Sequence, residues 1–158
     1  MSMTTWKREY LPGFDDFEGR WGLYTKKHMD TKTLRQLDAL SRLKWRGLRP
    51  RSLEKHGVSA IMIKDAHLDD WRTCPYCISC TENGHTECRD CPITKATGLH
   101  CDQTNANDWR ATTPSPWDTW RDPDRNSGDP RLMIRVLEQT SIWIKENTKR
   151  GAKLSDVT

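Results

Sequence analysis

The sequence predicts a small, mainly α-helical protein whose helices surround a zinc-knuckle core, with little or no β-sheet. Only 34% of its 158 residues are apolar and its mean hydropathy is -0.90, so the hydrophobic core must be small. A chain with so little apolar surface usually needs a disulfide or a metal ion to hold its fold. All six cysteines fall within residues 74–101, and two other segments carry apolar residues at helical spacing.

We expect five regions along the chain. These are a basic, aromatic-rich helical region (1–73), a Cys-rich zinc knuckle (74–101), a Trp-containing polar loop (102–128), an amphipathic helix (129–150) and a flexible tail (151–158). The first region carries 15 Lys and Arg against 10 Asp and Glu, whereas the formal net charge of the whole chain is only +4. The positive charge is therefore concentrated in the N-terminal half, even though the total charge alone does not indicate a nucleic-acid binder.

The first element is an aromatic stripe at helical spacing, formed by Phe14, Phe17, Trp21, Tyr24 and His28. Two glycines within it weaken a helix, so a short strand over residues 21–24 is the alternative. In both cases we expect these side chains to pack in the core.

A second helix should begin after Asp30 or Thr31, either of which can cap it, and should run towards Trp45. Its leucines step by three residues and are Leu34, Leu37, Leu40 and Leu43. Because three residues cover less than one helical turn, successive leucines shift around the helix axis. The apolar surface is therefore broad and needs an equally broad apolar neighbour, within the fold or on a partner.

A basic segment follows this helix. Gly47 and Pro50 should end the helix and expose a loop, and residues 42–55 hold six basic residues against one acid. Lys and Arg can neutralise phosphates and Trp45 can stack on a base, so the segment is a candidate nucleic-acid interface, with a solvated loop as the alternative. The candidate residues are Arg42, Lys44, Trp45, Arg46, Arg49, Arg51 and Lys55. The apolar run over residues 58–63 is compatible with a strand or with one helical turn.

The cysteines have the spacing Cys74-x2-Cys77-x2-Cys80-x7-Cys88-x2-Cys91-x9-Cys101, with His85 and His100 among them. A Cys-x2-Cys turn directs two thiolates at one ion, and two such turns complete a closed, structural zinc site. The preferred ligands are Cys77, Cys88, Cys91 and Cys101, and the alternatives are Cys74, Cys80, His85 and His100. Because there are more donors than one tetrahedron uses, the pattern is compatible with one or two zinc ions.

Other metal chemistry is an alternative for the same cysteines. Their order resembles the binuclear Zn2Cys6 modules that bind DNA, although Cys77 and Cys80 are too close together for that pattern. The first three also resemble the start of a ferredoxin run, with Cys91 as a fourth ligand at an unusual spacing, so an iron-sulfur redox protein is the alternative to zinc. Disulfides are not expected, because the N-terminus lacks a signal peptide's apolar stretch and a reducing cytosol favours metal ligation.

We expect no catalytic site. His85, Glu87 and Cys88 begin a superficial match to the zinc deaminase signature, but Glu87 abuts Cys88 and cannot reach a separate zinc-bound water. An all-thiolate zinc site also leaves no position for an activated water. A metal-dependent nuclease is the remaining catalytic alternative, and it would have to gather widely separated side chains. Those side chains are His28, His56, His67, Asp65, Asp69 and Asp70.

The polar segment after Cys101 is predicted to be a loop, and three tryptophans within it are candidate anchors of a protein interface. They are Trp109, Trp117 and Trp120. The clearest helix follows, with Asp129 as its N-cap and Pro130 at its first position. Its apolar face is formed by Met133, Val136, Leu137, Thr140 and Ile144. Gly151 should end this helix, and the last residues should fray.

Four stretches together resemble a loose group of small, Cys-rich bacteriophage proteins. They are Cys74-Pro75-Tyr76-Cys77, Cys88-Arg89-Asp90-Cys91-Pro92-Ile93, Gly98-Leu99-His100-Cys101 and Ser115-Pro116-Trp117-x2-Trp120. The resemblance covers residues 74–120, and Cys80 and the long basic region before the cysteines depart from it. It implies a small phage-encoded accessory protein that acts in a host cytoplasm, with cysteines that resemble zinc ligands and no known catalytic role.

The sequence therefore favours a zinc-stabilised accessory protein that binds DNA or RNA through its basic segment. The alternative is a modulator or inhibitor that binds a host or phage protein through the Trp-containing loop and an uncovered helix face. No stretch approaches the length of an apolar membrane span, and no motif indicates a small-molecule substrate. We accordingly expect a cytoplasmic protein without a membrane partner.

Overall fold

The structure is a computed structural model that describes residues 2–13, 26–69, 73–82, 85–86, 88–98, 120 and 130–157. These residues are mostly helical, which confirms the predicted fold class. The helices and strands are α1 (Met3–Tyr10), α2 (Lys26–Asp30), α3 (Leu34–Gly47), α4 (Pro50–His56), α5 (Ala60–Asp65), α6 (Pro75–Ser79), β1 (Thr81–Glu82), β2 (His85–Thr86), η2 (Cys88–Asp90), α7 (Pro92–Thr97), α9 (Arg131–Asn147) and η3 (Leu154–Asp156).

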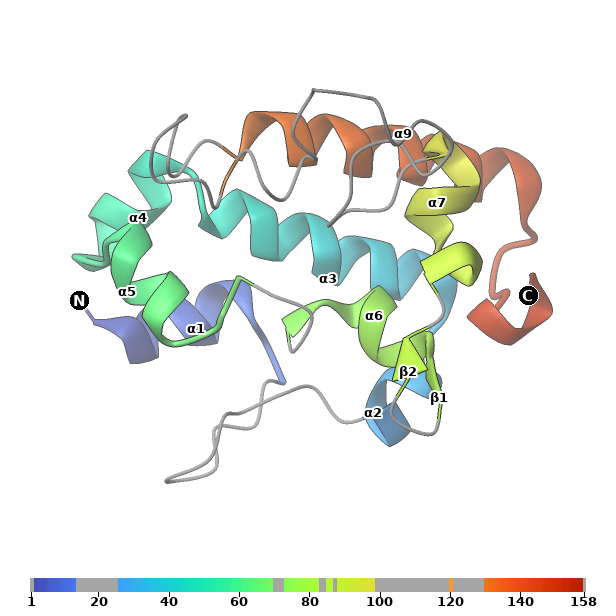
Figure 1. Ribbon diagram of the computed structural model, residues 1–158, viewed down its shortest axis with the longest axis horizontal. Helices are drawn as coiled ribbons and strands as arrows, with labels where there is room; N and C mark the ends of the chain where they lie inside the picture. The colour runs from blue at the N-terminus through green and yellow to red at the C-terminus, as the bar shows by residue number, and fades with distance from the viewer. Residues whose placement is uncertain are drawn as a thin grey trace.

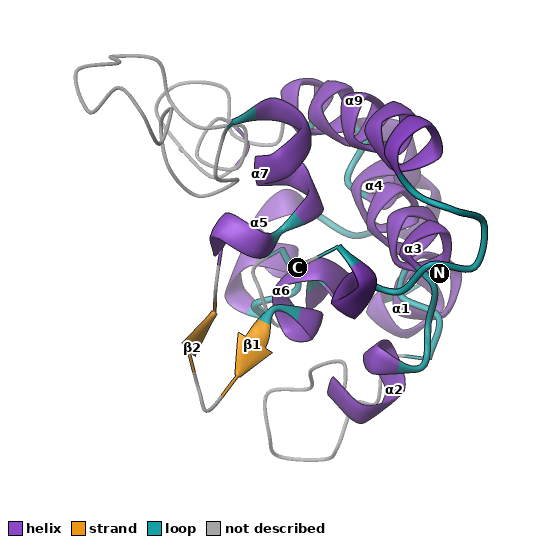
Figure 2. Cartoon of the chain, turned by 90° about the vertical axis from the view of Figure 1, so that its right-hand side faces the viewer, coloured by secondary structure: helices purple, strands orange, loops and turns teal. Residues whose placement is uncertain are grey.

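Helix α3 lies at the centre of the molecule (Figure 1). Helix α9 runs antiparallel along one side of it, and α1 and α6 pack against its other side. Helix α7 packs on α9, and the short β1–β2 hairpin projects beyond α6 (Figure 2). The centre of α3 is therefore enclosed by helices, which is the broad apolar neighbour that its leucines require.

The start of α3 is fixed by a capping box between Thr33 and Gln36. The Thr33 hydroxyl accepts a hydrogen bond from the Gln36 backbone N–H at 3.2 Å, and the Gln36 side chain accepts one from the Thr33 N–H at 2.9 Å. The predicted caps, Asp30 and Thr31, are wrong, because Asp30 ends α2 and Thr31 lies in the turn after it.

The other end of α3 is held by α1, which the sequence did not predict. Trp6 is fully buried and its indole Nε1 donates a hydrogen bond to the Gly47 carbonyl at 2.8 Å. A Cβ at Gly47 would lie 2.4 Å from Cγ of Tyr10, so only glycine lets the two helices approach this closely. This contact holds the junction between α3 and α4 in place.

Two short segments are helices rather than loop or strand. Pro50 occupies the first position of α4, where its missing N–H costs nothing, so the predicted exposed loop is in fact a helix start. Residues 60–65 form α5, whose N-cap Ser59 accepts a hydrogen bond from the Met62 backbone N–H at 3.2 Å. The basic segment is therefore carried by α3, α4 and the turn between them.

The buried face of α9 contains all five residues predicted for it, namely Met133, Val136, Leu137, Thr140 and Ile144. The helix ends at Asn147 instead of residue 150, because Thr148 adopts an extended backbone with ψ 150°. The predicted frayed tail is wrong for residues 152–157. Ala152 accepts a hydrogen bond from the Leu34 N–H at 2.8 Å, and Leu154 is buried in the core.

Several predicted features lie outside the described residues. They are the aromatic stripe at Phe14, Phe17, Trp21 and Tyr24, the polar loop except Trp120, the cap Asp129, and the side chains of Asp70, His85, Glu87, His100 and Cys101. Across the residues that are described, no helix combines the length and apolar character that crossing a lipid bilayer requires.

Candidate metal centre and nucleic-acid interface

The described cysteines lie where α6, the hairpin, η2 and α7 follow one another in the chain. Cys74 is the N-cap of α6 and Cys91 is the N-cap of α7, and a proline at the first helical position follows each of them. Between them, β1 and β2 pair antiparallel with Thr81 opposite Thr86, which turns the chain back on itself. Cys74, Cys77, Cys80, Cys88 and Cys91 are all outside disulfides.

Cys74 and Cys77 share the first turn of α6. Because α6 begins at Pro75, these cysteines occupy its N-cap and third positions, which share one side of a helix turn. Cys74 is half-buried, whereas Cys77 is only 8% exposed, so solvent reaches the two sulfurs unequally.

The surroundings of Cys74 favour its thiolate. The hydrogen bond from Cys77 is the largest cause, burial opposes it, and the Lys44 ammonium and the N–H groups of Tyr76 and Cys77 reinforce it. Together they lower the pKa of Cys74 from 9.0 to about 6.

Lys44 belongs to this interior site rather than to the surface. Its side chain is 2% exposed, and Nζ donates a hydrogen bond to the Asp69 carbonyl at 3.0 Å. The ammonium also lies 5.7 Å from the centroid of a Trp45 ring, within range of a cation–π contact. Lys44 is therefore a basic residue of the core and not of the surface, and its charge favours the Cys74 thiolate.

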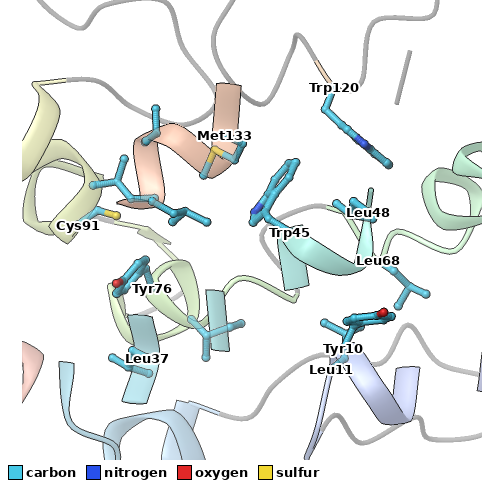
Figure 3. Close-up of a cluster of buried hydrophobic side chains, with 14 of the residues drawn as sticks. Tyr10, Leu11, Leu37, Trp45, Leu48, Leu68, Tyr76, Cys91, Trp120 and Met133 are labelled. Carbon is cyan, nitrogen blue, oxygen red and sulfur yellow. The ribbon is translucent and has the colours of Figure 1, made fainter. Parts of the chain in front are cut away.

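Tyr76 lies between Cys74 and Cys77 in the sequence at the start of α6. It is fully buried, and its hydroxyl donates a hydrogen bond to Oδ1 of Asp38 at 3.2 Å, while Arg42 bonds Oδ2 at 3.0 Å. Burial, followed by the nearby charges of Asp38 and Cys91, raises the pKa of Tyr76 well above its ordinary value of 10.0. Figure 3 shows Tyr76 and Cys91 within one buried cluster. Tyr76 thus stays a neutral donor between the two Cys-Pro turns.

The donor chemistry of this region fits zinc, because thiolates are the ligands of a closed, structural zinc site. Among the described residues, no three Cys, His, Asp or Glu side chains converge on a position for a metal ion. Cys80 lies at the opposite end of α6, where it lines a cavity of about 330 Å³ with residues of α2 and the C-terminal turn. The structure places Cys77 on the same helix turn as Cys74, which the sequence ranked only as an alternative ligand. The signal for this placement was Pro75, which marks a helix start between the two cysteines.

The residues that a nuclease would require are not brought together in the described part of the chain. His56 instead connects two helices: Nε2 lies 2.8 Å from a Glu9 carboxylate oxygen on α1, and Nδ1 lies 2.9 Å from the Thr5 hydroxyl. Its ring also meets Tyr10 edge-on, with centroids 5.8 Å apart. This histidine has a structural role in joining α4 to α1.

Two tryptophans with predicted surface roles lie in the core. Trp45 is 3% exposed, and its ring meets Trp120 edge-on with centroids 6.0 Å apart (Figure 3). Trp120 is fully buried, and Lys64 Nζ lies 5.0 Å from its ring centroid. The expectations that Trp45 stacks on a base and that Trp120 anchors an interface are therefore wrong. Both indoles are large apolar surfaces that the small core uses for packing.

Some charged residues of the basic segment are buried or ion-paired, and others are exposed. Lys44 is buried, and Arg42 is bound to the buried Asp38. Lys55 bonds both oxygens of Glu9, at 2.9 and 3.0 Å, and that contact is the main reason why the pKa of Glu9 is lowered to about 2. These three residues are poor candidates for contacting a phosphate.

Three arginines remain on the surface at the junction of α3 and α4. Arg46, Arg49 and Arg51 are exposed, and none has an acidic partner among the described residues. Arg49 is the N-cap of α4, and its backbone N–H bonds the Arg46 carbonyl at 3.2 Å. We call these three residues the arginine corner.

Searches of protein-family models, of curated proteins and of solved structures with this chain find no match.

Proposed function

We propose that this protein is a zinc-stabilised accessory protein that binds nucleic acid through the arginine corner. The observation that carries the proposal is the presence of three exposed arginines within residues 46–51, at a junction that the Trp6–Gly47 contact and Pro50 hold in place. Arginine presents a rigid, permanently charged fork that matches phosphate oxygens. Positively charged groups held this close together can contact successive phosphates of one strand.

The corner supports phosphate contact rather than base reading. The aromatic side chain closest to it in sequence, Trp45, is buried and unable to stack on a base. Contacts to the sugar-phosphate backbone position a protein without selecting a sequence. We therefore expect binding that depends strongly on salt and weakly on sequence.

A pair of charge-matched triple variants tests this interface. The corner variant carries Arg46→Ala, Arg49→Ala and Arg51→Ala. The control carries Lys145→Ala, Lys149→Ala and Arg150→Ala, which are exposed residues at and just after the end of α9. The end of α9 lies far from α4 (Figure 1). Each variant lowers the formal net charge from +4 to +1.

Binding of labelled DNA and RNA oligonucleotides is measured by fluorescence anisotropy over a range of salt concentrations. The corner variant should bind more weakly, and its plot of log affinity against log salt should be shallower by about one per lost arginine. The control should keep the wild-type slope. Equal weakening of both variants would show that net charge alone drives binding, and the corner would not be an interface.

The zinc part of the proposal rests on the donor chemistry of residues 74–101 and has its own test. Zinc would supply a cross-link in a chain with little apolar surface, held by Cys77, Cys88, Cys91 and Cys101. Metal content per chain should be about one zinc without visible absorbance, whereas iron with a broad band near roughly 400 nm would indicate a cluster. Cys88→Ser should lose the zinc. Cys80→Ser, at the far end of α6, should retain it.

A protein partner in the host or phage is the second candidate. Burial of Trp120 removes one of the three tryptophans proposed for that interface, and the neighbours of α3 cover its leucine face. The phage origin and host cytoplasm remain part of the proposal and rest on the sequence resemblance alone. Capture from a lysate with and without nuclease separates the candidates: material lost on nuclease treatment supports nucleic acid, and a retained protein band supports a protein partner.

A further inference from the structure

We propose that the cavity bounded by α2, the end of α6 and the C-terminal turn η3 binds a small phosphorylated molecule with an apolar part, the chemistry of a nucleoside monophosphate. The cavity has a volume of about 330 Å³, and small-molecule sites in proteins occupy roughly 300–1,000 Å³. Its described lining contains no residue of the arginine corner, so the proposal does not depend on nucleic-acid binding there.

The walls of the cavity come from segments far apart in the sequence, and hydrogen bonds hold these segments in place. Lys26 of α2 donates a hydrogen bond from Nζ to the Ser79 carbonyl of α6 at 3.1 Å. The Leu34 N–H donates to the Ala152 carbonyl at 2.8 Å, and Leu154 in the following turn is buried in the core. The cavity is therefore a product of tertiary packing and not of a single loop.

The first support is the positive charge at the cavity. Lys26, Lys32 and Lys153 all line it. Lys26 is ion-paired with Asp30 at 3.0 Å, whereas Lys32 and Lys153 have no ion pair within the described part of the chain. A lysine ammonium is a compact charge with three donors and is a common ligand of phosphate. Lys32 and Lys153 are therefore the residues that would hold a phosphate group.

The second support is a buried hydroxyl in the cavity wall. Ser79 lines the cavity and is 8% exposed, and its Oγ has no hydrogen-bond partner among the described residues. Buried polar atoms of folded proteins nearly always have a partner. An oxygen of a bound ligand would supply one. Because the Ser79 carbonyl already binds Lys26, this hydroxyl and an ammonium belong to the same wall.

The third support is the apolar part of the lining, which a simple inorganic anion would not use. Met29, Leu37 and Leu154 belong to the hydrophobic core and also line the cavity. A flat apolar group such as a nucleobase can pack against side chains of this kind. The site therefore suits an organic phosphate better than phosphate alone.

The acidic residues of the lining limit the charge of the ligand. Asp30 and Asp90 line the cavity together with the three lysines, so the formal charge of the described lining is +1. A carboxylate accepts hydrogen bonds from hydroxyl or amino groups and repels a second phosphate. One phosphate with ribose hydroxyls fits this balance, and a nucleoside triphosphate does not.

The test is isothermal titration calorimetry of the full chain with the monophosphates of adenosine, guanosine, cytidine and uridine. At least one of them should bind with one site per chain. Ribose 5-phosphate, which lacks the base, and the matching nucleoside, which lacks the phosphate, should each bind at least about tenfold more weakly. Absence of binding by all four nucleotides, or equally tight binding of ribose 5-phosphate, would overturn the proposal.

Charge-matched variants locate the phosphate. Lys32→Ala and Lys153→Ala should each weaken nucleotide binding about tenfold, because each removes a charged donor. The controls are Lys27→Ala and Lys149→Ala, which remove the same charge from exposed positions outside the described lining and should bind as the wild type does. Equal weakening in variants and controls would mean that net charge, and not the cavity, attracts the nucleotide.

Two readouts locate the ligand at the end of α6. Ser79→Ala should weaken binding about three- to tenfold without loss of thermal stability, because the hydroxyl lacks a partner within the described protein. Bound nucleotide should also slow alkylation of Cys80, which lines the cavity, and leave alkylation of Cys74 at the other end of α6 unchanged. An unchanged affinity of Ser79→Ala, or equal protection of both cysteines, would contradict this location.

The corner variant keeps this proposal separate from the proposed function. Arg46→Ala with Arg49→Ala and Arg51→Ala should bind the nucleotide as tightly as the wild type, and Lys153→Ala should bind oligonucleotides with the wild-type salt slope. Loss of oligonucleotide binding in the corner variant alone would leave the cavity proposal intact. Loss of nucleotide binding in that variant would place the nucleotide at the arginine corner and overturn the cavity site.

Discussion

Two of the three Cys-x2-Cys segments, Cys74–Cys77 and Cys88–Cys91, adopt different local structures although their spacing is the same. In the first, proline follows the leading cysteine, so α6 begins at Pro75 and carries Cys74 and Cys77 on one turn. In the second, proline follows the trailing cysteine, so α7 begins at Pro92 and leaves Cys88 behind in η2. Proline is favoured at the first helical position and disfavoured within a helix, so its place in the motif decides where the helix starts.

The comparison shows that cysteine spacing alone does not assign chemistry. The first turn carries Cys74 and Cys77 at the N-cap and third positions of one short helix, on the same side of its first turn. The second turn presents one half-buried and one buried sulfur on consecutive elements, which suits ligands that an ion must draw together. Substitutions at equivalent positions of the two turns can sharpen this contrast.

The largest expected difference concerns the residue two positions after the leading cysteine, which is Tyr76 in the first turn and Asp90 in the second. Tyr76 is fully buried, whereas Asp90 is half-buried at the rim of a cavity. Tyr76→Ala should lower the free energy of unfolding by about 3–5 kcal/mol, because it leaves a large cavity in the core. Asp90→Ala should change it by less than about 0.5 kcal/mol. Urea denaturation followed by circular dichroism measures both.

Tyr76→Phe separates the ring from the hydroxyl. Only the hydrogen bond to Asp38 is lost, and Arg42 still bonds the other carboxylate oxygen, so the cost should be about 1 kcal/mol. A loss as large as that of Tyr76→Ala would mean that the buried polar contact, and not packing, anchors the first turn. Stability changes of equal size for Tyr76→Ala and Asp90→Ala would remove the contrast between the turns.

The sequence predicts those structural features that depend on residues close together in the chain. The apolar face of α9 and the leucine helix α3 were predicted correctly because helical periodicity is a local signal. The roles of Trp45 and Trp120 were mistaken because each stands among polar or charged neighbours, and their mutual contact spans residues 45 and 120. Long-range packing of this kind leaves no periodic trace in the sequence.

The same distinction between local and long-range features applies to the candidate site. The cysteine cluster and its metal-ligand chemistry follow from spacing, and Pro75 was a visible sign that Cys74 would share a helix turn with Cys77. Lys44 could not have been identified, because a lysine in a basic helix looks like surface until α3 is enclosed by its neighbours. The arginine corner was predicted only as part of a larger patch. Burial and ion pairs, which depend on the folded chain, reduced that patch to three residues.

The alkylation rate of Cys74 should depend on pH, and this effect is intermediate in size. Since the pKa of Cys74 is lowered to about 6, its thiolate is present above that pH and is lost as the pH falls below it. The alkylation rate of Cys74 should therefore reach half of its plateau near pH 6, as measured by peptide mass spectrometry. Lys44→Met should move this midpoint upward, because the ammonium that favours the thiolate is gone. An unchanged midpoint in a folded variant would show that Lys44 does not act on this sulfur.

The smallest expected effect concerns the two prolines. Pro75→Ala gives the unfolded chain more conformations at the start of α6, so the free energy of unfolding should fall by about 0.4–1 kcal/mol. Pro92→Ala should lower it by a similar amount, because Pro92 occupies the same first position of α7. Urea denaturation followed by circular dichroism measures both variants. A much larger loss for Pro75→Ala than for Pro92→Ala would show that the first turn needs its proline for the folded structure as well.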